Sequence, residues 1–529
     1  MKKIITILVV FALVGLSAMA QAPNWAWAKS AGGGNHETTS SVHSDASGNV
    51  YITGYFSDST ITFGSTVLVN DNNGTDDIFL VKYDASGNVL WAKRAGGNDT
   101  DDANSITTDP WGNVYITGQY ASGTIHFGNI TLIENDTIQG LGAIFIAKYD
   151  ASGNVIWAKS AGGNGFDFAY SITSDNAGNI YISGNYGDSA ITFGSTILPI
   201  TSSLFLTKYD SSGNVIWATS GGSSYGADGW SVATDPSGKI YLTGDFSSTI
   251  SLGTTTLIGS GANSIYIAKF DSSGNVLWAK CSQGTFYDAP NSIAVDNSGN
   301  AFVTGFFESP IITFGSISLT NSSSDTTSDV FLVKYDSSGN IQWGKRAGQP
   351  AISEGADAVI TDVFGNAYIA GNFQSGSMVF DTINISYPTM FLVKYSGNGN
   401  AIWGKDVGPS VYPAAMCIDY TGNIYITGEY SGTATFGSST ISTLDTGAIF
   451  LAKINNTVGI CDCYSIPNIS IYPNPTTHLL TISIANKNLK SVTLNLYDMM
   501  GQLMVEKRMD NGQLEMDIRD IEQGVYSRH

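Results

Sequence analysis

The sequence predicts an all-β protein, a seven-bladed β-propeller closed by its own N-terminal strand. A unit of four strand-like runs recurs seven times, and the last copy lacks the strand that stands alone before the first. The composition agrees, because charged residues make up only 13%, aromatic residues 11%, and 60 of 529 residues are Gly. Such a mixture suits strands joined by turns and argues against disorder. The tryptophans that align the repeats lie 60 to 66 residues apart; they are Trp27, Trp91, Trp157, Trp217, Trp278, Trp343 and Trp403.

Each repeat carries the same order of strand signals. A short apolar strand such as Ser105–Thr108 comes first, and an Asp-x-x-Gly-Asn turn leads to a strand of the type Val114–Gly118. A Thr-Phe-Gly excursion then leads to an Ile-Phe-Leu-x-Lys-Tyr strand, a second turn of the type Asp-x-Ser-Gly-Asn, and the Trp strand. Apolar and polar residues alternate along these runs with the period of two that strands require.

The two recurrent turns have a physical reason for their residues. Gly at the fourth position supplies a positive φ, and the leading Asp can accept hydrogen bonds from N–H groups of the turn. A calcium loop is the alternative, but the turns lack the further carboxylates of such a loop, which favours hairpin turns. The first turn begins at Asp45, Asp109, Asp175, Asp235, Asp296, Asp362 and Asp419, and the second at Asp84, Asp150, Asp210, Asp271 and Asp336.

The two ends of the array indicate how the ring closes. The last copy reaches Ile449–Lys453 and stops before its second turn and Trp strand, whereas Trp25–Lys29 is a Trp strand without a blade. We expect these two strands to pair, because a closed ring leaves no exposed sheet edge. An open β-solenoid is the alternative, but its coils are usually shorter than this repeat.

The repeat unit GNVYITG…TFG…DIFLVKYDASGNVLWAK resembles the secreted bacterial β-propeller repeat called SBBP, over about residues 24 to 454. The departures are mild: Lys239 replaces the turn Asn, Leu252 replaces the Phe of the excursion, and Ser396 replaces the Asp of one second turn. The resemblance implies a propeller on an exported protein, and it implies no common enzymatic activity.

The N-terminus reads as a signal peptide over residues 1–20, followed by the propeller over residues 21–454. Lys2 and Lys3 precede the apolar run Ile4–Leu16, and Ala18-Met19-Ala20 fits a small-x-small cleavage site. The apolar run is too short to span a bilayer, so no transmembrane segment is expected.

Residues 455–467 read as a linker, and residues 468–529 resemble the type A C-terminal sorting domain of the type IX secretion system of Bacteroidetes-like bacteria, a small Ig-like β-sandwich. The resemblance rests on YPNP at Tyr472–Pro475, LYDxxG at Leu496–Gly501 and GVY at Gly524–Tyr526. It implies the type IX machinery as a partner and delivery to the cell surface or the medium. In the family a further strand and a basic end follow GVY, where this chain has Ser527-Arg528-His529. We therefore expect an incomplete sandwich, which would leave the protein in the periplasm if sorting failed.

The sequence carries no local motif of a catalytic site. It lacks a zinc-spaced His pair, a G-x-S-x-G nucleophile, and a Gly-rich phosphate loop before a helix. The net charge of −20 argues against nucleic acid and anionic membranes as partners. One Lys recurs in the third strand of every repeat, and we expect a framework role in which its stem covers apolar surface while its head pairs with a nearby carboxylate; the series is Lys82, Lys148, Lys208, Lys269, Lys334, Lys394 and Lys453.

A second recurrent charge lies in the loop between the Trp strand and the next blade. In a propeller these loops emerge near the channel mouth, on the face that also carries the excursions. The carboxylates either cap N–H groups of the loops or form an acidic rim that binds cations such as Ca²⁺, a basic ligand or a polyhydroxylated ligand. No other cofactor is expected. The candidate rim residues are Glu37, Asp101, Asp167, Asp228, Asp288 and Glu354.

These observations favour a non-catalytic binding, adhesion or scaffold protein whose extracellular ligand is a glycan or a protein. The alternative is a secreted carbohydrate-active hydrolase or lyase that uses rim carboxylates. Catalysis requires unique residues in a few blades, and the exceptional residues Trp111, Trp230 and Arg346 do not form a constellation in the sequence. A structural surface-layer component is a third reading, which predicts self-assembly.

Overall fold

The computed structural model divides the chain into two compact units, Met1–Asn456 and Thr457–His529, which are described separately. It describes residues 22–455 apart from short gaps at 33, 35–36, 71, 73, 135–141, 188, 201–202, 224–225, 324–326, 351–352, 374–375, 387–389 and 445–446, and six strands of the second unit. The predicted signal peptide and most of the predicted linker lie outside these residues. The described residues are organised in strands and turns, without helices.

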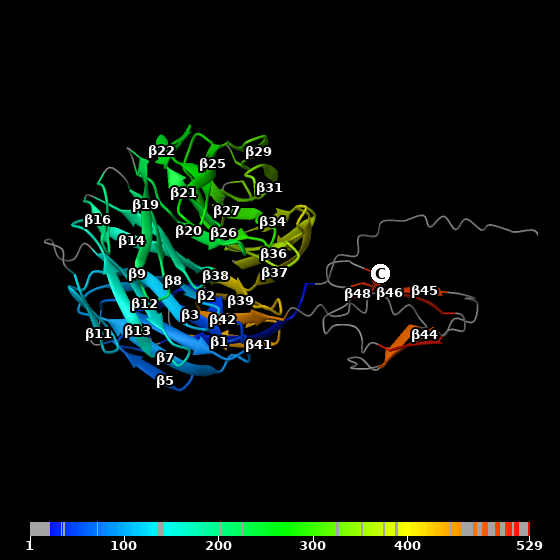
Figure 1. The fold of residues 1–529 in the computed structure, drawn as a ribbon. Helices are drawn as coiled ribbons and strands as arrows, with labels where there is room; N and C mark the ends of the chain where they lie inside the picture. The colour runs from blue at the N-terminus through cyan, green and yellow to red at the C-terminus, as the bar shows by residue number, and fades with distance from the viewer. Residues whose placement is uncertain are drawn as a thin grey trace, which may run out of the picture. The chain divides into compact units, whose positions relative to one another are not determined.

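The first unit is a closed ring of seven blades, each a four-stranded antiparallel sheet (Figure 1). The strands of each blade are given from the innermost to the outermost. Blade 1 consists of β2 (Glu37–Ser44), β3 (Val50–Phe56), β6 (Asp77–Tyr83) and β7 (Val89–Gly96), and blade 2 of β8 (Asp101–Thr108), β9 (Val114–Tyr120), β12 (Ala143–Tyr149) and β13 (Val155–Ala161). Blade 3 consists of β14 (Asp167–Ser174), β15 (Ile180–Tyr186), β18 (Leu204–Tyr209) and β19 (Val215–Ser223), and blade 4 of β20 (Ser231–Thr234), β21 (Ile240–Phe246), β24 (Ser264–Phe270) and β25 (Val276–Gln283).

Blades 5 to 7 follow the same order. They consist of β26 (Asp288–Val295), β27 (Ala301–Phe307), β30 (Asp329–Tyr335) and β31 (Ile341–Ala347); β32 (Gly355–Thr361), β33 (Ala367–Asn372), β36 (Met390–Tyr395) and β37 (Ala401–Val407); and β38 (Val411–Ile418), β39 (Ile424–Tyr430), β42 (Ala448–Ile454) and β1 (Trp25–Ala31). The predicted fold class is therefore confirmed.

The ring closes as the sequence predicts. In blade 7 the N-terminal β1 pairs antiparallel with β42, so that Trp27 faces Lys453 and Ala31 faces Ile449. In Figure 1 the blue β1 lies beside β42, the last strand of the array. The two ends of the repeat array thus share one sheet, which leaves the ring without an open edge at this point.

The leading Asp of the first turn does what its position predicts. Asp109 Oδ1 accepts the N–H groups of Trp111 and Asn113 at 3.0 and 2.9 Å. Its Oδ2 accepts from the Asn113 amide at 2.7 Å and from the Tyr115 hydroxyl at 3.0 Å. In all seven first turns the Asp accepts the N–H groups two and four residues ahead, so these turns are hairpin turns organised by their own carboxylate.

The recurrent Trp and Lys tie each blade to the next by what we call the interblade clasp. In blade 1, Trp91 Nε1 and Lys82 Nζ donate hydrogen bonds of 3.2 and 3.0 Å to one carbonyl oxygen, that of Ala151 in the second turn of blade 2. The Lys82 ammonium also lies 5.1 Å from the centre of the Tyr51 ring of its own blade. The framework role predicted for the Lys series is confirmed, with a carbonyl of the neighbouring blade as its main partner.

The clasp recurs at five further seams of the ring. At each seam one Trp and one Lys donate to the same carbonyl of the next second turn, and these carbonyls belong to Ser211, Ser272, Ser337, Gly397 and Ala85. Blade 7 has no second turn, because its two outer strands β42 and β1 come from opposite ends of the array, and at the seam from blade 6 to blade 7 Lys394 pairs with Asp362 at 3.1 Å. The turn Gly makes room for the clasp: a Cβ on Gly153 would lie 2.9 Å from the Trp91 ring.

The Thr-Phe-Gly excursions form two-stranded hairpins that cover the neighbouring blade. The hairpin β10–β11 of blade 2 pairs with β7, the outermost strand of blade 1, through His126↔Gly96 and Phe127↔Ala95. The hairpins of blades 4 and 5 pair with the preceding blade in the same way. Outer edges are thus capped by the next repeat. The hairpins are β4 (Thr60–Phe63) with β5 (Thr66–Val69), β10 (Thr124–Phe127) with β11 (Ile130–Ile133), β16 (Ile191–Phe193) with β17 (Thr196–Leu198), β22 (Thr249–Leu252) with β23 (Thr255–Ile258), β28 (Ile311–Phe314) with β29 (Ile317–Thr320), β34 (Ser377–Phe380) with β35 (Ile383–Ser386), and β40 (Thr433–Phe436) with β41 (Ser439–Ser442).

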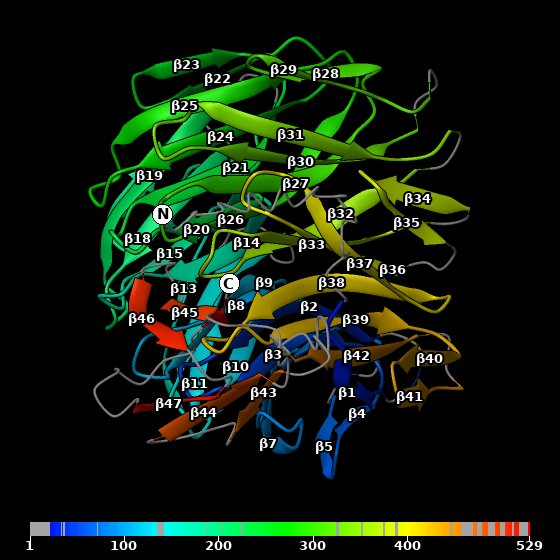
Figure 2. The ribbon, with the colours of Figure 1, turned by 90° about the vertical axis from the view of Figure 1, so that its right-hand side faces the viewer.

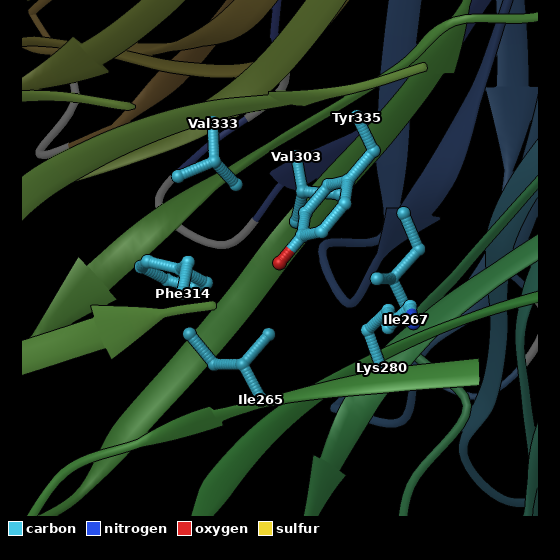
Figure 3. Close-up of a pocket in the computed structure, with 7 residues that line it drawn as sticks. All are labelled: Ile265, Ile267, Lys280, Val303, Phe314, Val333 and Tyr335. Atoms are coloured by element: carbon cyan, nitrogen blue, oxygen red, sulfur yellow. The ribbon is translucent and has the colours of Figure 1, made fainter. Parts of the chain in front are cut away.

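A small apolar gap remains between blades 4 and 5. Figure 3 shows aliphatic side chains around the Tyr335 ring; the lining residues are Ile265, Ile267, Lys280, Val303, Phe314, Val333 and Tyr335. The gap measures about 10 Å³, which is at the limit for one water molecule. We therefore regard it as a packing defect between blades and not as a ligand site.

The second unit contains two three-stranded sheets. One has the order β43 (Ile469–Tyr472), β44 (Leu479–Ile484), β47 (Gln513–Asp517), and the other the order β46 (Leu503–Met509), β45 (Val492–Tyr497), β48 (Ser527–Arg528). The Ig-like assignment and its incompleteness stay predictions.

Two glycines of blade 2 allow the contribution of the clasp to stability to be distinguished from the contribution of backbone strain. Gly112 and Gly153 have nearly equal positive φ values of 81° and 79°, but only Gly153 lies against a Trp ring. We expect Gly112→Ala to cost about 1 kcal/mol of unfolding free energy from the φ penalty alone, and Gly153→Ala to cost about 1–3 kcal/mol more because the Trp91 ring must move. Urea unfolding followed by tryptophan fluorescence measures this, since all ten Trp lie in the propeller. Equal losses would contradict the clasp.

Deleting residues 21–30 tests the ring closure. The deletion removes most of β1 with its ladder to β42 and the Trp27 contribution to the clasp, so we expect a loss of several kcal/mol and a lower Tm. Trp27→Phe is the control: it keeps the strand and removes one hydrogen bond, at a cost of about 1 kcal/mol. A deletion variant that melts like the parent would refute the closure.

Candidate functional site

The innermost strands carry one extra residue at the same place in each blade. The register of β8 against β9 shifts between Ala103 and Ser105, so Asn104 is a bulge. A bulge re-aims the side chain that it carries. Equivalent shifts occur in the other innermost strands, and in blade 4 the register gains one residue between Ala227 and Ser231. The bulge residues of blades 1 to 7 are Ser40, Asn104, Tyr170, Trp230, Asn291, Asp357 and Ala414.

All seven bulge residues line one cavity of about 180 Å³ in the central channel. The innermost strands, among them β14, β20 and β26, gather around this axis (Figure 2). Because every blade carries this bulge, the seven bulge side chains form a ring that faces a common space. This ring is the candidate functional site, and its members differ from blade to blade.

The residue after each bulge is constant in five blades and holds the ring together. Ser41 Oγ accepts the N–H of Ile106 in the next blade at 3.3 Å. The same bond, at 3.1 to 3.2 Å, joins the next four seams, through Ser105, Ser171, Ser231 and Ser292. Blades 6 and 7 carry Ala358 and Ala415 at this position. A fixed frame of backbone and serine hydroxyls therefore surrounds the variable bulge residues.

Blades 3 and 4 place a group of unusual side chains beside the channel. The Trp230 and Tyr170 rings stack with centres 4.4 Å apart and planes 23° apart. Trp230 Nε1 and Asn263 Nδ2 both donate to the carboxylate of Asp245, whose side chain is buried. Burial raises the pKa of Asp245 to about 7. Trp230, an isolated exception in the sequence, therefore belongs to a constellation that forms only when neighbouring blades meet.

Asp228 is the one predicted rim residue that joins this group. It accepts a hydrogen bond from the Asn185 amide, and its side chain is half-buried. Burial raises its pKa. It also lies close enough to Asp245 for the two charges to interact.

The other predicted rim residues lie at the start of the innermost strands, where each is buried. Glu37, Asp101, Asp167 and Asp288 are the first residues of β2, β8, β14 and β26, and Glu354 precedes β32. Four of these carboxylates accept hydrogen bonds from nearby loops. Asp101 accepts from the Ser122 hydroxyl at 2.9 Å, Asp288 from the Ser309 hydroxyl at 2.7 Å, Asp167 from the Gly163 N–H at 2.7 Å, and Glu37 from the Gly34 N–H at 2.8 Å.

These contacts are the loop capping that we weighed against a ligand role; a ligand role for the rim stays a prediction. Burial raises the pKa of Asp101 to about 8, although hydrogen bonds from Ser122 lower it. Burial raises the pKa of Asp288 to about 6. Burial and the neighbouring Asp329 raise that of Glu354 to about 8.

The remaining exceptional residues have structural partners. Arg346 pairs with the buried Asp329 at 2.8 Å, and Arg94 pairs with Asp77 at the equivalent place in blade 1. The exposed Trp111 ring packs over Gly178 of the next blade. Within the described part of the chain, no group of three or more His, Cys, Asp or Glu side chains is placed to hold a metal ion. Calcium binding stays a prediction.

The fold defines the protein class as a seven-bladed β-propeller with variable channel residues. Comparison with known families then identifies both parts of the chain. A model of the β-propeller repeat SBBP matches residues 90–119, and a model of the secretion system C-terminal sorting domain matches residues 470–529. The chain thus combines a seven-bladed propeller that contains a match to the SBBP repeat with a C-terminal segment that matches the sorting domain.

The sorting domain indicates export to the cell surface or the medium and implies interaction with the type IX machinery. No helix among the described residues has the length and apolar character needed to cross a membrane.

Two curated proteins are similar to part of this chain. The uncharacterized WD repeat-containing protein L264 of Acanthamoeba polyphaga mimivirus is 27% identical over 499 residues, which cover 77% of this chain and 36% of that protein. The regulatory protein FlaEY of Caulobacter vibrioides is 27% identical over 247 residues, 42% of this chain and 25% of that protein. The chain therefore spans only about a third or less of the relatives it matches.

Solved structures with similar folds are distant. The WD40 propeller domain of Doa1 is 10% identical with a TM-score of 0.40, over 81% of this chain and 96% of that one. PorZ, an essential surface component of the type IX secretion system of Porphyromonas gingivalis, is 11% identical with a TM-score of 0.30, over 91% and 72%. An apocarotenoid oxygenase of Synechocystis is 10% identical with a TM-score of 0.37, over 81% and 93%. At these scores the likenesses support no argument about function.

Because burial raises the pKa of carboxyl groups such as Asp101, we expect the free energy of unfolding to fall as pH rises. The folded pKa of Asp101 is about 8, above the value near 3.9 of an unfolded chain, so the folded state holds a proton that the unfolded state releases. The stabilisation contributed by the Asp101 carboxyl group is complete below pH 4 and is lost as pH rises to 8. Over this range the free energy of unfolding falls by at most about 1.4 kcal/mol per pH unit. Urea unfolding between pH 5.5 and 8.5 should give a smaller slope for Asp101→Asn.

Asp150 serves as the control, because the pH dependence of its contribution to stability has the opposite sign. Hydrogen bonds from Asn154 lower its pKa, so its stabilisation is present at neutral pH and is lost as pH falls through that pKa. Asp150→Asn should therefore destabilise the protein at pH 7 and lose this effect in acid. A slope unchanged by Asp101→Asn would contradict the protonated state of Asp101.

Proposed function

We propose that this protein is a secreted or cell-surface, non-catalytic binding propeller whose ligand enters the channel from the face that carries the interblade loops and hairpins. One observation supports the proposal most strongly. Seven bulges direct side chains into one cavity, and these side chains belong to six residue types while the surrounding frame repeats. A rigid scaffold with variable residues at one place suits recognition.

The geometry of the blades supports this choice of face. The innermost strands begin at the loop face, and both Asp-turns of each blade lie at the other ends of the strands. The channel residues that differ between blades, together with the Trp230 group, lie near the strand starts. The repeated turns lie at the opposite face, where they form the interblade clasp and hold the ring together.

A carbohydrate-active enzyme is the second candidate, and one observation favours it. Asp245 and Asp357 have pKa values raised by burial to about 7, a range suited to a general acid. Both the binding role and the enzymatic role predict carbohydrate or protein ligands at the channel, so turnover is the property that separates them.

Binding arrays of glycans and extracellular matrix proteins, probed with the full chain, test the proposal. We expect the parent to bind at least one ligand, and Trp230→Ala to weaken that binding at least tenfold because the central anchor of the site is removed. Phe364→Ala, a half-exposed aromatic residue of a first turn, should bind like the parent. Binding that is equally sensitive to Phe364→Ala would contradict the assignment of the binding site to the loop face. Degradation of any polymer would overturn the non-catalytic role.

A further inference from the structure

A row of aromatic side chains leads along blade 3 into the channel. Phe166, Phe168 and Tyr170 occupy every second position; Phe166 directly precedes β14, and Phe168 and Tyr170 lie within it. Successive ring centres lie 6.3 and 6.1 Å apart, with planes within 5° and 3° of parallel. Trp230 of blade 4 continues the row by stacking on Tyr170. We call these four residues the aromatic row.

The row connects the outer surface to the cavity. Phe166 is 50% exposed, Phe168 is half-buried, and Tyr170 and Trp230 line the cavity of about 180 Å³. Pockets for drug-sized ligands measure about 300–1,000 Å³. The cavity therefore has room for one small ring, and a longer ligand must continue outwards along the row.

Carboxylates and amides accompany the inner end of the row. Asn185 holds Asp228, while Trp230 and Asn263 hold Asp245, so both carboxylates are fixed beside the aromatic rings. Asp357 lines the same cavity from blade 6. Its Oδ2 atom is buried and receives no hydrogen bond from the part of the chain that the structure describes. A buried carboxyl oxygen without a donor is costly, so a ligand hydroxyl that enters the cavity would gain by donating to it.

This chemistry selects among ligands. Flat aromatic faces cover the apolar C–H faces of rings, and fixed carboxylates and amides bind hydroxyl groups. The acidic groups and the net charge of −20 repel polyanions. A single ammonium group would use one open ring face beside a carboxylate and would leave the rest of the aromatic row unused. A chain of neutral rings with hydroxyl groups makes use of the whole arrangement.

We propose that the aromatic row and the channel cavity bind a neutral oligosaccharide, with a terminal sugar ring beside Tyr170 and Trp230 and further rings along Phe168 and Phe166. This inference rests on the proposed binding function and assigns its ligand class. It also assigns a direction: one end of the glycan enters the channel, and the rest leaves over blade 3.

Calorimetric titration of the full chain with neutral gluco-, manno- and chito-oligosaccharides of increasing length tests the inference. We expect affinity to rise with length until Phe166 is covered. Phe166→Ala should weaken the long oligosaccharides about fivefold, the worth of one aromatic contact, and leave disaccharides unchanged. Trp230→Phe keeps a ring but loses the N–H bond to Asp245, and it should weaken every length. Tyr420→Ala, a 71% exposed aromatic residue of a first turn, is the matched control and should bind like the parent.

The possible failures are distinguishable. If the parent binds a protein ligand through Trp230 but no oligosaccharide, the ligand class is wrong and the binding function stands. Stronger binding of uronate oligosaccharides, or of a Lys-rich peptide displaced by none of the sugars, would also overturn the inference. Equal effects of Phe166→Ala on short and long oligosaccharides would refute the direction. If no ligand of any class depends on the loop face, the proposed function fails as well.

Discussion

The structure depends on a single carbonyl oxygen that six of the seven blades offer to the preceding blade. The indole N–H and the ammonium group of one blade converge on this oxygen, and the Gly of the same turn lets the Trp ring approach. The seam that closes the ring shows the importance of the arrangement. There Trp27 comes from the N-terminal strand and Lys453 from the last strand of the array, and both donate to the Ala85 carbonyl. The two ends of the array therefore act together as one blade, because a single acceptor recruits a donor from each.

The clasp and the serine seams hold the frame, which leaves the bulge position free to vary. A side chain at a bulge takes no part in the ladder, so its identity does not affect sheet pairing. Ser, Asn, Tyr, Trp, Asp and Ala all occupy it in this ring. Some bulge residues serve the frame as well: the amides of Asn104 and Asn291 donate to the Ala169 and Ala356 carbonyls of the next blade. Blades 3, 4 and 6 carry Tyr170, Trp230 and Asp357, and these give the channel its chemical character.

Two matched families agree with this division between frame and site. The repeat model describes the frame, whose residues recur, and the sorting domain describes delivery, which is independent of the ligand. The SBBP match spans one bulge residue of the channel, Asn104, and the sorting-domain match spans none. The curated relatives are similar to this chain over only part of their length, so they add no evidence about the site. Under the proposed binding function, recognition resides in the departures from the repeat.

The amino-acid sequence by itself determined the blade number, the strand order, the two turns and the closure by the first strand. Each follows from local periodicity, from Gly and Asp at fixed offsets, or from counting strands at the two ends. The recurrent Lys also revealed its framework role, but its partner lies in another repeat some 60 residues away and no spacing identifies it. Only the tertiary structure decided the site. Tyr170 and Trp230, 60 positions apart, stack because adjacent innermost strands converge on the axis, and they are joined by Asp245 from β21 and Asn263 from the loop before β24. The buried state of Asp101 and Glu354 was equally hidden, because exposure at a loop base depends on how neighbouring blades pack.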